Sequence, residues 1–292
     1  MSSSNRALPQ RLRKHVAERL AISLQRVDAL FRAGRLSVVT PESADPQRST
    51  LDALVFENDR VLFDGTALPE RALPAVVLLN KPKHVTSTAC DPAGKRDLAP
   101  YLREMPAGCF PVGRLDRETT GLLLFTNDGE LASAVLRPDH LTTKTYWLWL
   151  DDELSPSDPR LAQLTSGVLH QGERLAAKCA RLISSSESAS ELELTLTQGR
   201  NRQIRHMCRA LDLHLVHLHR RRIGPLDDTA LALGDWRPLT DGELAALWQA
   251  VGGRAAVRER KLAALRQQAR AARTAGTPRL RLEHWLEGEQ RA

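Results

Sequence analysis

Two kinds of hydrophobic patterning follow one another along the chain. Between residues 12 and 36, apolar residues recur at helical spacing in two short stripes, within 12–20 and 27–31. A strand-like run follows at 36–39, and the segment 60–65 resembles a strand that ends in an Asp-Gly turn. These patterns predict a small N-terminal domain made of two short helices followed by a sheet.

A longer region with strand-like patterning follows a Pro-bounded linker at 69–74. Helical character there is limited to 130–136 and 203–211, so strands and helices do not alternate as βαβ units. We therefore expect an α+β fold with a largely antiparallel sheet. The short apolar or alternating runs that predict its strands lie at 75–79, 111–115, 121–126, 144–150 and 191–197.

These boundaries divide the chain into three parts. We expect a small N-terminal domain over 1–70, a larger domain over 71–250, and a basic extension over 251–292. The extension is rich in Ala and Arg after Gly252-Gly253, and its pattern fits either a helix or a disordered tail.

Composition limits the protein class. The chain has 292 residues, of which 42% are hydrophobic and 26% charged, and these values are typical of globular proteins. No apolar run approaches the ~18 residues of a membrane span, and the polar, basic N-terminus lacks the apolar stretch of a secretion signal. The four cysteines form no CxxC pair, which argues against a zinc site and a disulfide framework. We expect a cytoplasmic protein with no membrane contact.

The positive charge is concentrated in three blocks. The net charge is +7, yet residues 6–35 hold eight Lys/Arg against two acids, 198–222 hold seven Arg against one, and 254–281 hold nine against one. Each block alone could be a solvated helix face. Three blocks in one chain favour binding to a polyanion, because Arg makes forked contacts to phosphate.

One polar loop between two apolar runs carries the candidate chemistry. It lies within 112–129, and in it Asp116 stands between Arg114 and Arg117. Neighbouring positive charges favour an ionised carboxylate, which a nucleophile or base requires. A salt-bridged surface Asp would have the same local sequence, so this segment alone leaves both interpretations open.

The longer pattern favours catalysis. The segment 113–129 resembles the GRLDxxTxGLLLxTNDG signature of bacterial ribosomal RNA pseudouridine synthases. Supporting blocks follow in the family's order: Leu79-Asn-Lys-Pro82, Lys144-Thr-Tyr146, the stretch 198–207 (QGRNRQIRHM) and the stretch 234–239 (GDWRPL). In weaker form, the N-terminal region resembles the S4-type RNA-binding domain.

The resemblance implies uridine-to-pseudouridine isomerisation in ribosomal RNA, without a metal or another cofactor. It implies that Asp116 is the catalytic carboxylate, oriented by Arg114 and paired with Arg205. It also implies that Tyr146 stacks on the base and helps to remove the C5 proton, and that Ile204 packs beneath the flipped base.

The basic and polar positions in the matching blocks, together with the N-terminal helices, are the expected RNA contacts: Arg11, Arg13, Lys14, Arg26, Arg32, Lys81, Arg117, Lys144, Arg200, Asn201, Arg202 and Gln203. The sequence departs from the family pattern at Lys83-His84, at Gln198 and at His206. These departures concern RNA contacts, since none falls on the three positions assigned to chemistry.

Two other functions remain as alternatives: a non-catalytic RNA-binding or ribosome-assembly protein on the same scaffold, and a tRNA-modifying isomerase. The presence of Asp116, Tyr146 and Arg205 favours the enzyme. Cys208 and the basic extension resemble the large-subunit branch, so we expect a target in 23S rather than 16S rRNA. The expected partner is ribosomal RNA or a pre-ribosomal particle, and the expected enzyme is a monomer.

Overall fold

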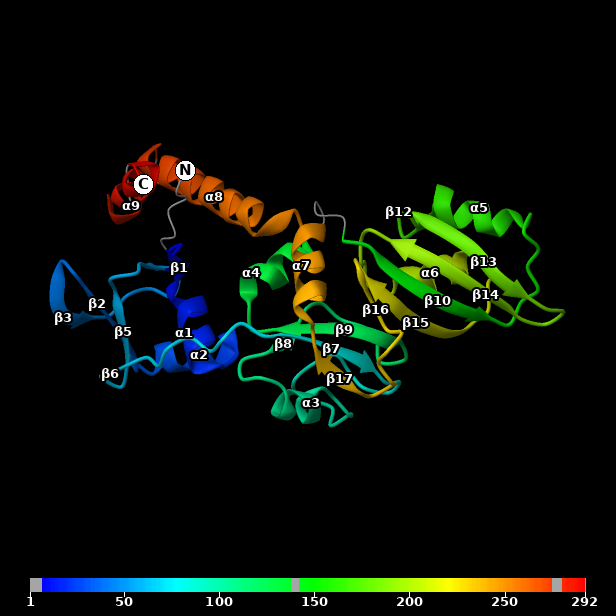
Figure 1. Ribbon diagram of the computed structural model, residues 1–292, viewed down its shortest axis with the longest axis horizontal. Helices are drawn as coiled ribbons and strands as arrows, with labels where there is room; N and C mark the ends of the chain where they lie inside the picture. Colours follow the sequence, from blue (N-terminus) through cyan, green and yellow to red (C-terminus); the bar gives the residue numbers. More distant parts are fainter. Residues whose placement is uncertain (1–6, 138–141, 275–279, 292) are drawn as a thin grey trace. The chain divides into compact units, whose positions relative to one another are not determined.

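The chain forms two structural units. A computed structural model describes residues 7–137, 142–274 and 280–291 (Figure 1). One unit combines residues 1–73 with 254–292, and the other spans 74–253. The basic extension, which the sequence predicted as a third part, is therefore grouped by its contacts with the N-terminal region.

The first unit begins with two short helices and a small antiparallel sheet. Ser23 caps the second helix, where its hydroxyl accepts a hydrogen bond from the Arg26 amide at 3.2 Å. Val16 and Val27 are fully buried, and they pack with Leu36 and Val61 of the sheet. The elements are α1 (Leu12–Leu20), α2 (Leu24–Arg32), a sheet in the order β3 (Ser43–Gln47), β2 (Leu36–Thr40), β5 (Arg60–Phe63), β6 (Thr66–Ala67), and the pair β1 (Gln10–Arg11) with β4 (Leu54–Val55).

The C-terminal helices α8 (Gly253–Thr274) and α9 (Leu280–Arg291) complete this unit. Their buried apolar residues Leu262, Leu265, Leu282 and Trp285 form one cluster, against which N-terminal side chains that include Phe56 pack. An ion pair between Arg281 and the fully buried carboxylate of Asp59 adds a polar contact. The extension groups with the N-terminal region because its apolar stripe needs a surface to cover it.

The second unit is built on a nine-stranded sheet that is antiparallel except where β15 meets β9. This confirms the predicted α+β fold with a largely antiparallel sheet. The main strand order is β13 (Cys179–Ser185), β14 (Ser190–Leu196), β10 (Lys144–Leu150), β15 (Leu215–Ile223), β9 (Thr120–Thr126), β7 (Val76–Lys81) and β17 (Trp236–Pro238), while β8 (Phe110–Pro111) pairs with β9 and β16 (Leu226–Asp227) with β15.

Shorter elements complete the second unit. They are the helices α3 (Ala99–Glu104), α4 (Gly129–Leu136), α5 (Pro159–Ser166), α6 (Gln203–Ala210) and α7 (Asp241–Ala250), and the hairpin β11 (Val168–His170) with β12 (Glu173–Leu175). In β14 every second residue is buried, as the alternating sequence predicted. Its leucines share a buried cluster with Ile204 and Met207 of α6, which fixes this helix on the sheet.

The predicted strand over 111–115 forms only in part. The strand ends at Pro111, and the last hydrogen bond to β9 runs from the Val112 amide to the Leu124 carbonyl at 2.7 Å. Gly113 then adopts a left-handed backbone conformation, with φ +83°, and turns the chain into a loop. This turn starts the polar segment that contains Asp116.

The contact between β9 and β15 requires a glycine. Gly121 lies beside Arg220 in the parallel register and has φ +105°. A Cβ there would lie 2.3 Å from the Arg220 carbonyl oxygen, far inside van der Waals contact. The missing side chain lets the two strands approach, and this approach places Arg220 next to the loop that precedes β9.

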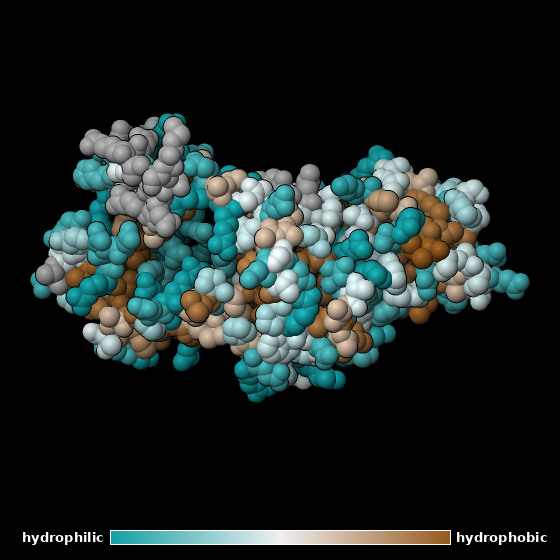
Figure 2. All heavy atoms as spheres, in the orientation of Figure 1, coloured by the Kyte–Doolittle hydropathy of each residue, from teal (hydrophilic) through white to brown (hydrophobic). Residues whose placement is uncertain are grey.

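Apolar side chains are mostly interior. On the face shown in Figure 2, hydrophilic and near-neutral residues prevail, and hydrophobic residues appear as separate patches. Within the described residues, no helix is both long and apolar enough to cross a membrane.

If α9 is a structural part of the first unit, then Trp285→Ala should destabilise that unit. Trp285 is only 6% exposed, and truncating a buried Trp costs about 3–5 kcal/mol. Hydrogen exchange should accelerate in β1, α1 and β4 and stay unchanged in the second unit. The matched control is His284→Ala, which removes the exposed neighbouring side chain. Equal exchange in both variants would contradict this role of α9.

Candidate active site

The segment that follows β7 anchors the loop 113–119 by hydrogen bonds to the loop backbone. The buried hydroxyl of Ser87 donates to the Leu115 carbonyl at 2.7 Å and accepts from the Leu115 amide at 3.1 Å. The His84 amide donates to the Arg117 carbonyl at 2.8 Å, and a turn closes between the Asp116 carbonyl and the Thr119 amide. These hydrogen bonds to the loop backbone fix the position of Asp116 independently of any contact to its carboxylate.

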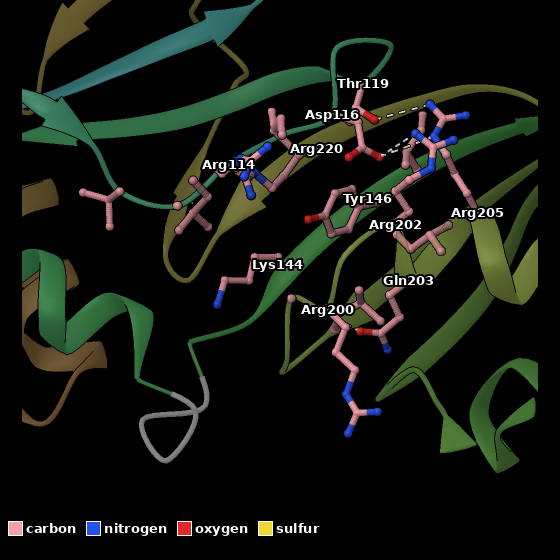
Figure 3. A pocket seen from close by; sticks show the side chains of 18 of the residues that line it. Arg114, Asp116, Thr119, Lys144, Tyr146, Arg200, Arg202, Gln203, Arg205 and Arg220 are labelled. Atoms are coloured by element: carbon pink, nitrogen blue, oxygen red, sulfur yellow. Dashed lines mark hydrogen bonds and ion pairs between the residues drawn. The ribbon is translucent and has the colours of Figure 1, made fainter. Parts of the chain in front are cut away.

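Two guanidinium groups near the start of α6 face the Asp116 carboxylate (Figure 3). Arg205 Nε and Arg202 Nη1 each lie 3.6 Å from the same oxygen, Oδ2. Arg205 also donates from Nη2 to the hydroxyl of Thr119 at 3.4 Å. The Asp116 side chain is 27% exposed, so the carboxylate is oriented by charge yet remains open to a ligand. The pair between Arg205 and Asp116 is the one that the family resemblance implied.

The orienting role expected of Arg114 is corrected by these contacts. Arg114 is exposed and has no ion pair with Asp116 among the described residues, whereas Arg202, expected to grip phosphate, forms one. The reason is the turn at Gly113, which directs the next side chain into the cavity rather than along the loop toward Asp116.

A cavity of about 180 Å³ lies between the loop, β10, β15 and the start of α6. Tyr146 lines it and is 8% exposed, and Lys144, two residues earlier on β10, projects from the same face of the strand. Ile204, 4% exposed, contributes an apolar wall. The cavity thus combines a carboxylate, an aromatic ring and an apolar surface, which is what a flipped pyrimidine needs.

The charge around this cavity is strongly positive. Asp116 is the single acidic residue among the described residues that line it, against six cations. This excess favours an anionic ligand, because burying like charges together without a counter-charge is unfavourable. The lining cations are Arg114, Lys144, Arg200, Arg202, Arg205 and Arg220.

The RNA contact expected of Lys81 is wrong, because its side chain is fully buried. Its ammonium donates to the carbonyls of Pro82 and Val85, both at 2.9 Å. Burial lowers the pKa of Lys81 to about 8. The residue holds the turn after β7 and reaches no solvent.

The RNA contact expected of Gln203 is also wrong. The Gln203 side chain is 5% exposed, and its amide donates to the Ala176 carbonyl at 3.1 Å, while its carbonyl oxygen accepts from the Arg200 amide at 3.3 Å. Gln203 therefore fastens α6 to the neighbouring loop. Arg200 is exposed and pairs with Glu173 at 2.6 Å, and Asn201 is exposed.

The remaining predicted RNA contacts lie outside this cavity. Arg117 is exposed and pairs with Glu118 at 2.7 Å. In the first unit, Arg11 pairs with Asp52, Arg13 with Asp28 and Lys14 with Glu18. The exposed side chains of Arg26 and Arg32 lie on α2 of the same unit.

Sequence reasoning missed three residues of the site: Ser87, Thr119 and Arg220. Arg220 carried a usable signal in its position on β15. It comes two residues after Leu218 and three before Ile223, and all three side chains are on the buried side of the strand. A charged residue at an inward position of a strand marks a site or a buried ion pair. Ser87 carried none, because its role depends on a contact with a distant loop. Among the described residues, no group of three His, Cys, Asp or Glu is placed to hold a metal ion.

Comparison with known proteins agrees with this geometry. The family model for RNA pseudouridylate synthase matches residues 75–210. The ribosomal large subunit pseudouridine synthase B of Bacillus subtilis is 32% identical over 80% of this chain and 94% of its own length. This chain belongs to the pseudouridine synthase family. The ribosomal small subunit pseudouridine synthase A of Escherichia coli is likewise 32% identical, over 81% of this chain and 99% of its own length.

A solved pseudouridylate synthase structure covers 82% of this pseudouridine synthase with 27% identity and a TM-score of 0.55. The family predicted from the loop signature is therefore confirmed. The prediction that the protein is an RNA pseudouridine synthase enzyme is confirmed as well. The relatives include both a large-subunit and a small-subunit enzyme at equal identity, so overall similarity does not separate these two branches.

Lys81→Met should lower the stability of the enzyme by about 1–3 kcal/mol, because two carbonyl groups lose their donor. It should leave the salt dependence of RNA affinity unchanged, since the ammonium reaches no phosphate. Denaturant unfolding and binding titrations at several salt concentrations measure the two effects. Lys83→Met, which removes an exposed neighbouring cation, is the control for stability.

The pH dependence gives a second readout for Lys81. Its pKa is about 8 in the folded enzyme against an ordinary 10.5, so the unfolded chain binds more protons between these pH values. The free energy of unfolding contributed by this group therefore rises as pH increases from 8 to 10.5. Lys81→Met should show a smaller rise than the wild type. Identical pH profiles would show that the ammonium is not desolvated.

Proposed function

We propose that this pseudouridine synthase converts uridine to pseudouridine in ribosomal RNA, acting on a flipped-out nucleotide with Asp116 as the catalytic carboxylate. The observation that carries the proposal is the Asp116 carboxylate, placed at the cavity and faced by Arg202 and Arg205. The ribosomal substrate is supported by the names of the relatives that match most of the chain.

The reaction needs one carboxylate and one group near C5 of the base. The N1–C1′ bond breaks, the uracil turns, C5 bonds to C1′, the C5 proton leaves and N1 gains a proton, so no atom is lost overall. Asp116 can act on the sugar, on the base or on a ribose proton, and each role requires an ionised carboxylate beside the nucleotide. The two guanidinium groups 3.6 Å away balance that charge and restrict its orientation.

Tyr146 is the second group in the proposed reaction. It lies on β10 with its ring between buried leucines and its hydroxyl directed into the cavity (Figure 3). The ring can stack on the uracil, and the hydroxyl can assist removal of the C5 proton after the base has turned. Ile204 closes the apolar side, where it excludes water from the base.

RNA affinity is assigned to exposed basic and polar residues other than the reacting groups. Arg200 is held by Glu173 in an exposed pair, and such surface pairs cost little to exchange for a phosphate. Asn201 and Arg117 lie on exposed turns of the same unit. In the first unit, the order of two helices followed by a sheet supports the proposal of an S4-type RNA-binding domain, whose basic residues would supply a second RNA contact.

The setting we propose is a cytoplasmic, monomeric enzyme that acts on rRNA or an assembling particle. The cysteines are free, and two of them, Cys90 and Cys179, are exposed, as suits a reducing compartment. Of the two ribosomal targets we propose 23S rRNA, on the basis of Cys208 and the basic helices after residue 253.

Asp116→Asn should abolish isomerisation, because the amide cannot act as nucleophile or base. RNA affinity should stay within a few fold, since phosphate contacts supply most of it. Tritium release from rRNA labelled at uridine C5 measures turnover, and filter binding measures affinity. Glu153→Gln, which neutralises an exposed carboxylate outside the cavity lining, is the matched control. Substantial release by Asp116→Asn would rule out the assigned role, and an inactive wild-type enzyme would favour a non-catalytic RNA-binding protein.

The target subunit is tested by mapping pseudouridines in both rRNAs of a strain that lacks the enzyme. One pseudouridine should disappear from 23S rRNA and return when the wild-type gene, but not Asp116→Asn, is restored. Loss of a 16S pseudouridine instead would keep the reaction class and overturn the choice of subunit.

A further inference from the structure

Arg220 is a buried cation whose donors are only partly used. The residue is 5% exposed, and its Nε donates to the Leu122 carbonyl at 2.7 Å. The terminal nitrogen Nη2 is buried and has no hydrogen-bond partner. A buried charged donor without an acceptor is costly, so a functional reason is expected for keeping it there.

Lys144 lies at the same cavity and adds a second uncompensated charge. It is half-buried on β10, two residues from Tyr146, and it is one of the residues that line the cavity (Figure 3). Burial and the positive charge of Arg220 lower the pKa of Lys144 to about 8. Both residues line the same cavity from the neighbouring strands β10 and β15. With this pKa, Lys144 remains mostly protonated near neutral pH.

No acid within the described residues forms an ion pair with either cation. The Asp116 carboxylate, the one acidic group of the cavity lining, is already faced by Arg202 and Arg205. Holding two cations together in a half-closed cavity is unfavourable unless a ligand brings the counter-charge. The described residues therefore leave room at this place for an anionic ligand.

The geometry points to a phosphate subsite at Arg220 and Lys144, which binds a phosphate of the flipped uridine nucleotide while Tyr146 stacks on its base. This inference rests on the proposed function and adds a second anchor for the substrate at the cavity itself. Arg220 lies in the basic block 198–222, but it belongs to none of the family-matched blocks and was not among the individual residues expected to contact RNA.

A phosphate fits these groups better than a base carbonyl does. A phosphodiester carries one negative charge and two non-bridging oxygens, so it can accept from the guanidinium and the ammonium together. A uracil carbonyl is neutral and would leave both cations uncompensated. The spacing also suits one nucleotide, because Tyr146 is paired in register with Arg220 across the strands and lies about 7 Å along β10 from Lys144.

Gly121 explains why the subsite exists in this sheet. Its missing side chain lets the backbone of β15 approach β9 at Arg220. The guanidinium can then reach the Leu122 carbonyl, which fixes it beneath the cavity. The rigid anchor orders the donor before the substrate arrives, which reduces the entropy lost on binding.

The test compares uridine with uridine 5′-monophosphate and uridine 3′-monophosphate as ligands of the full-length protein, with affinities measured by NMR titration. The wild type should bind one of the monophosphates at least about tenfold more tightly than uridine, the gain typical of a charge-assisted contact. Arg220→Gln and Lys144→Gln should each reduce this preference to about threefold or less while leaving uridine affinity unchanged. The isomer that is preferred identifies which flanking phosphate occupies the subsite.

Three further variants make the result specific. Arg220→Lys keeps a charge in place and should retain part of the preference, which separates loss of charge from damage to folding. Arg200→Gln removes an exposed cation of the same cavity and should leave the preference unchanged. Asp116→Asn should also keep it, so failure of the catalytic assignment is read separately from failure of the subsite.

Two results would overturn the subsite. One is a wild-type protein that binds uridine and both monophosphates equally well. The other is a preference that falls equally in Arg200→Gln and in Arg220→Gln, because this would assign it to the general positive charge of the cavity. With rRNA as substrate, the subsite further predicts that Lys144→Gln raises KM about tenfold and changes kcat less.

Discussion

The site depends on the attraction between one carboxylate and two guanidinium groups that the chain brings together from distant segments. Asp116 lies on a loop before β9, and Arg202 and Arg205 lie at the start of α6, almost ninety residues later. The loop is fixed by Ser87, and α6 is fixed by its apolar face and by Gln203. Because both sides are anchored independently, the carboxylate is ordered while remaining open to the cavity.

The rest of the cavity is arranged around an excess of positive charge. Among the described residues that line it, six cations stand against one acid, so the lining carries a net positive charge. Buried groups such as Lys81 show the alternative, in which a lysine is satisfied by two backbone carbonyls and takes no part in binding. Arg220 lacks this complete satisfaction, and the difference separates a residue that holds the fold from one that awaits a ligand.

The C-terminal helices show that a segment rich in Lys and Arg can still be a packed part of a domain. Residues 254–281 carry nine Lys/Arg, yet their apolar residues form a buried cluster with α9 and the N-terminal region. Part of the positive charge is also used internally, since Arg258 pairs with Glu289 at 2.6 Å and Arg281 with the buried Asp59. The helices therefore contribute to the stability of the first unit. Only those of their Lys and Arg side chains that remain exposed are available to contact RNA.

The sequence by itself determined the class of fold, the loop with Asp116 and the family, because these depend on short-range periodicity and on residues in a fixed local order. It also paired Arg205 with Asp116 and put Tyr146 in the site, through blocks that follow the family's order. Only the tertiary structure decided which cations are available. Lys81 and Gln203 look like RNA contacts in the sequence, but both side chains are buried and donate to backbone carbonyls, Lys81 to those of Pro82 and Val85 and Gln203 to that of Ala176. Arg220 looked unremarkable in a run of arginines, yet the close approach at Gly121 makes it part of the site. Burial and partner geometry arise from contacts between residues far apart in the chain, and a local pattern does not contain them.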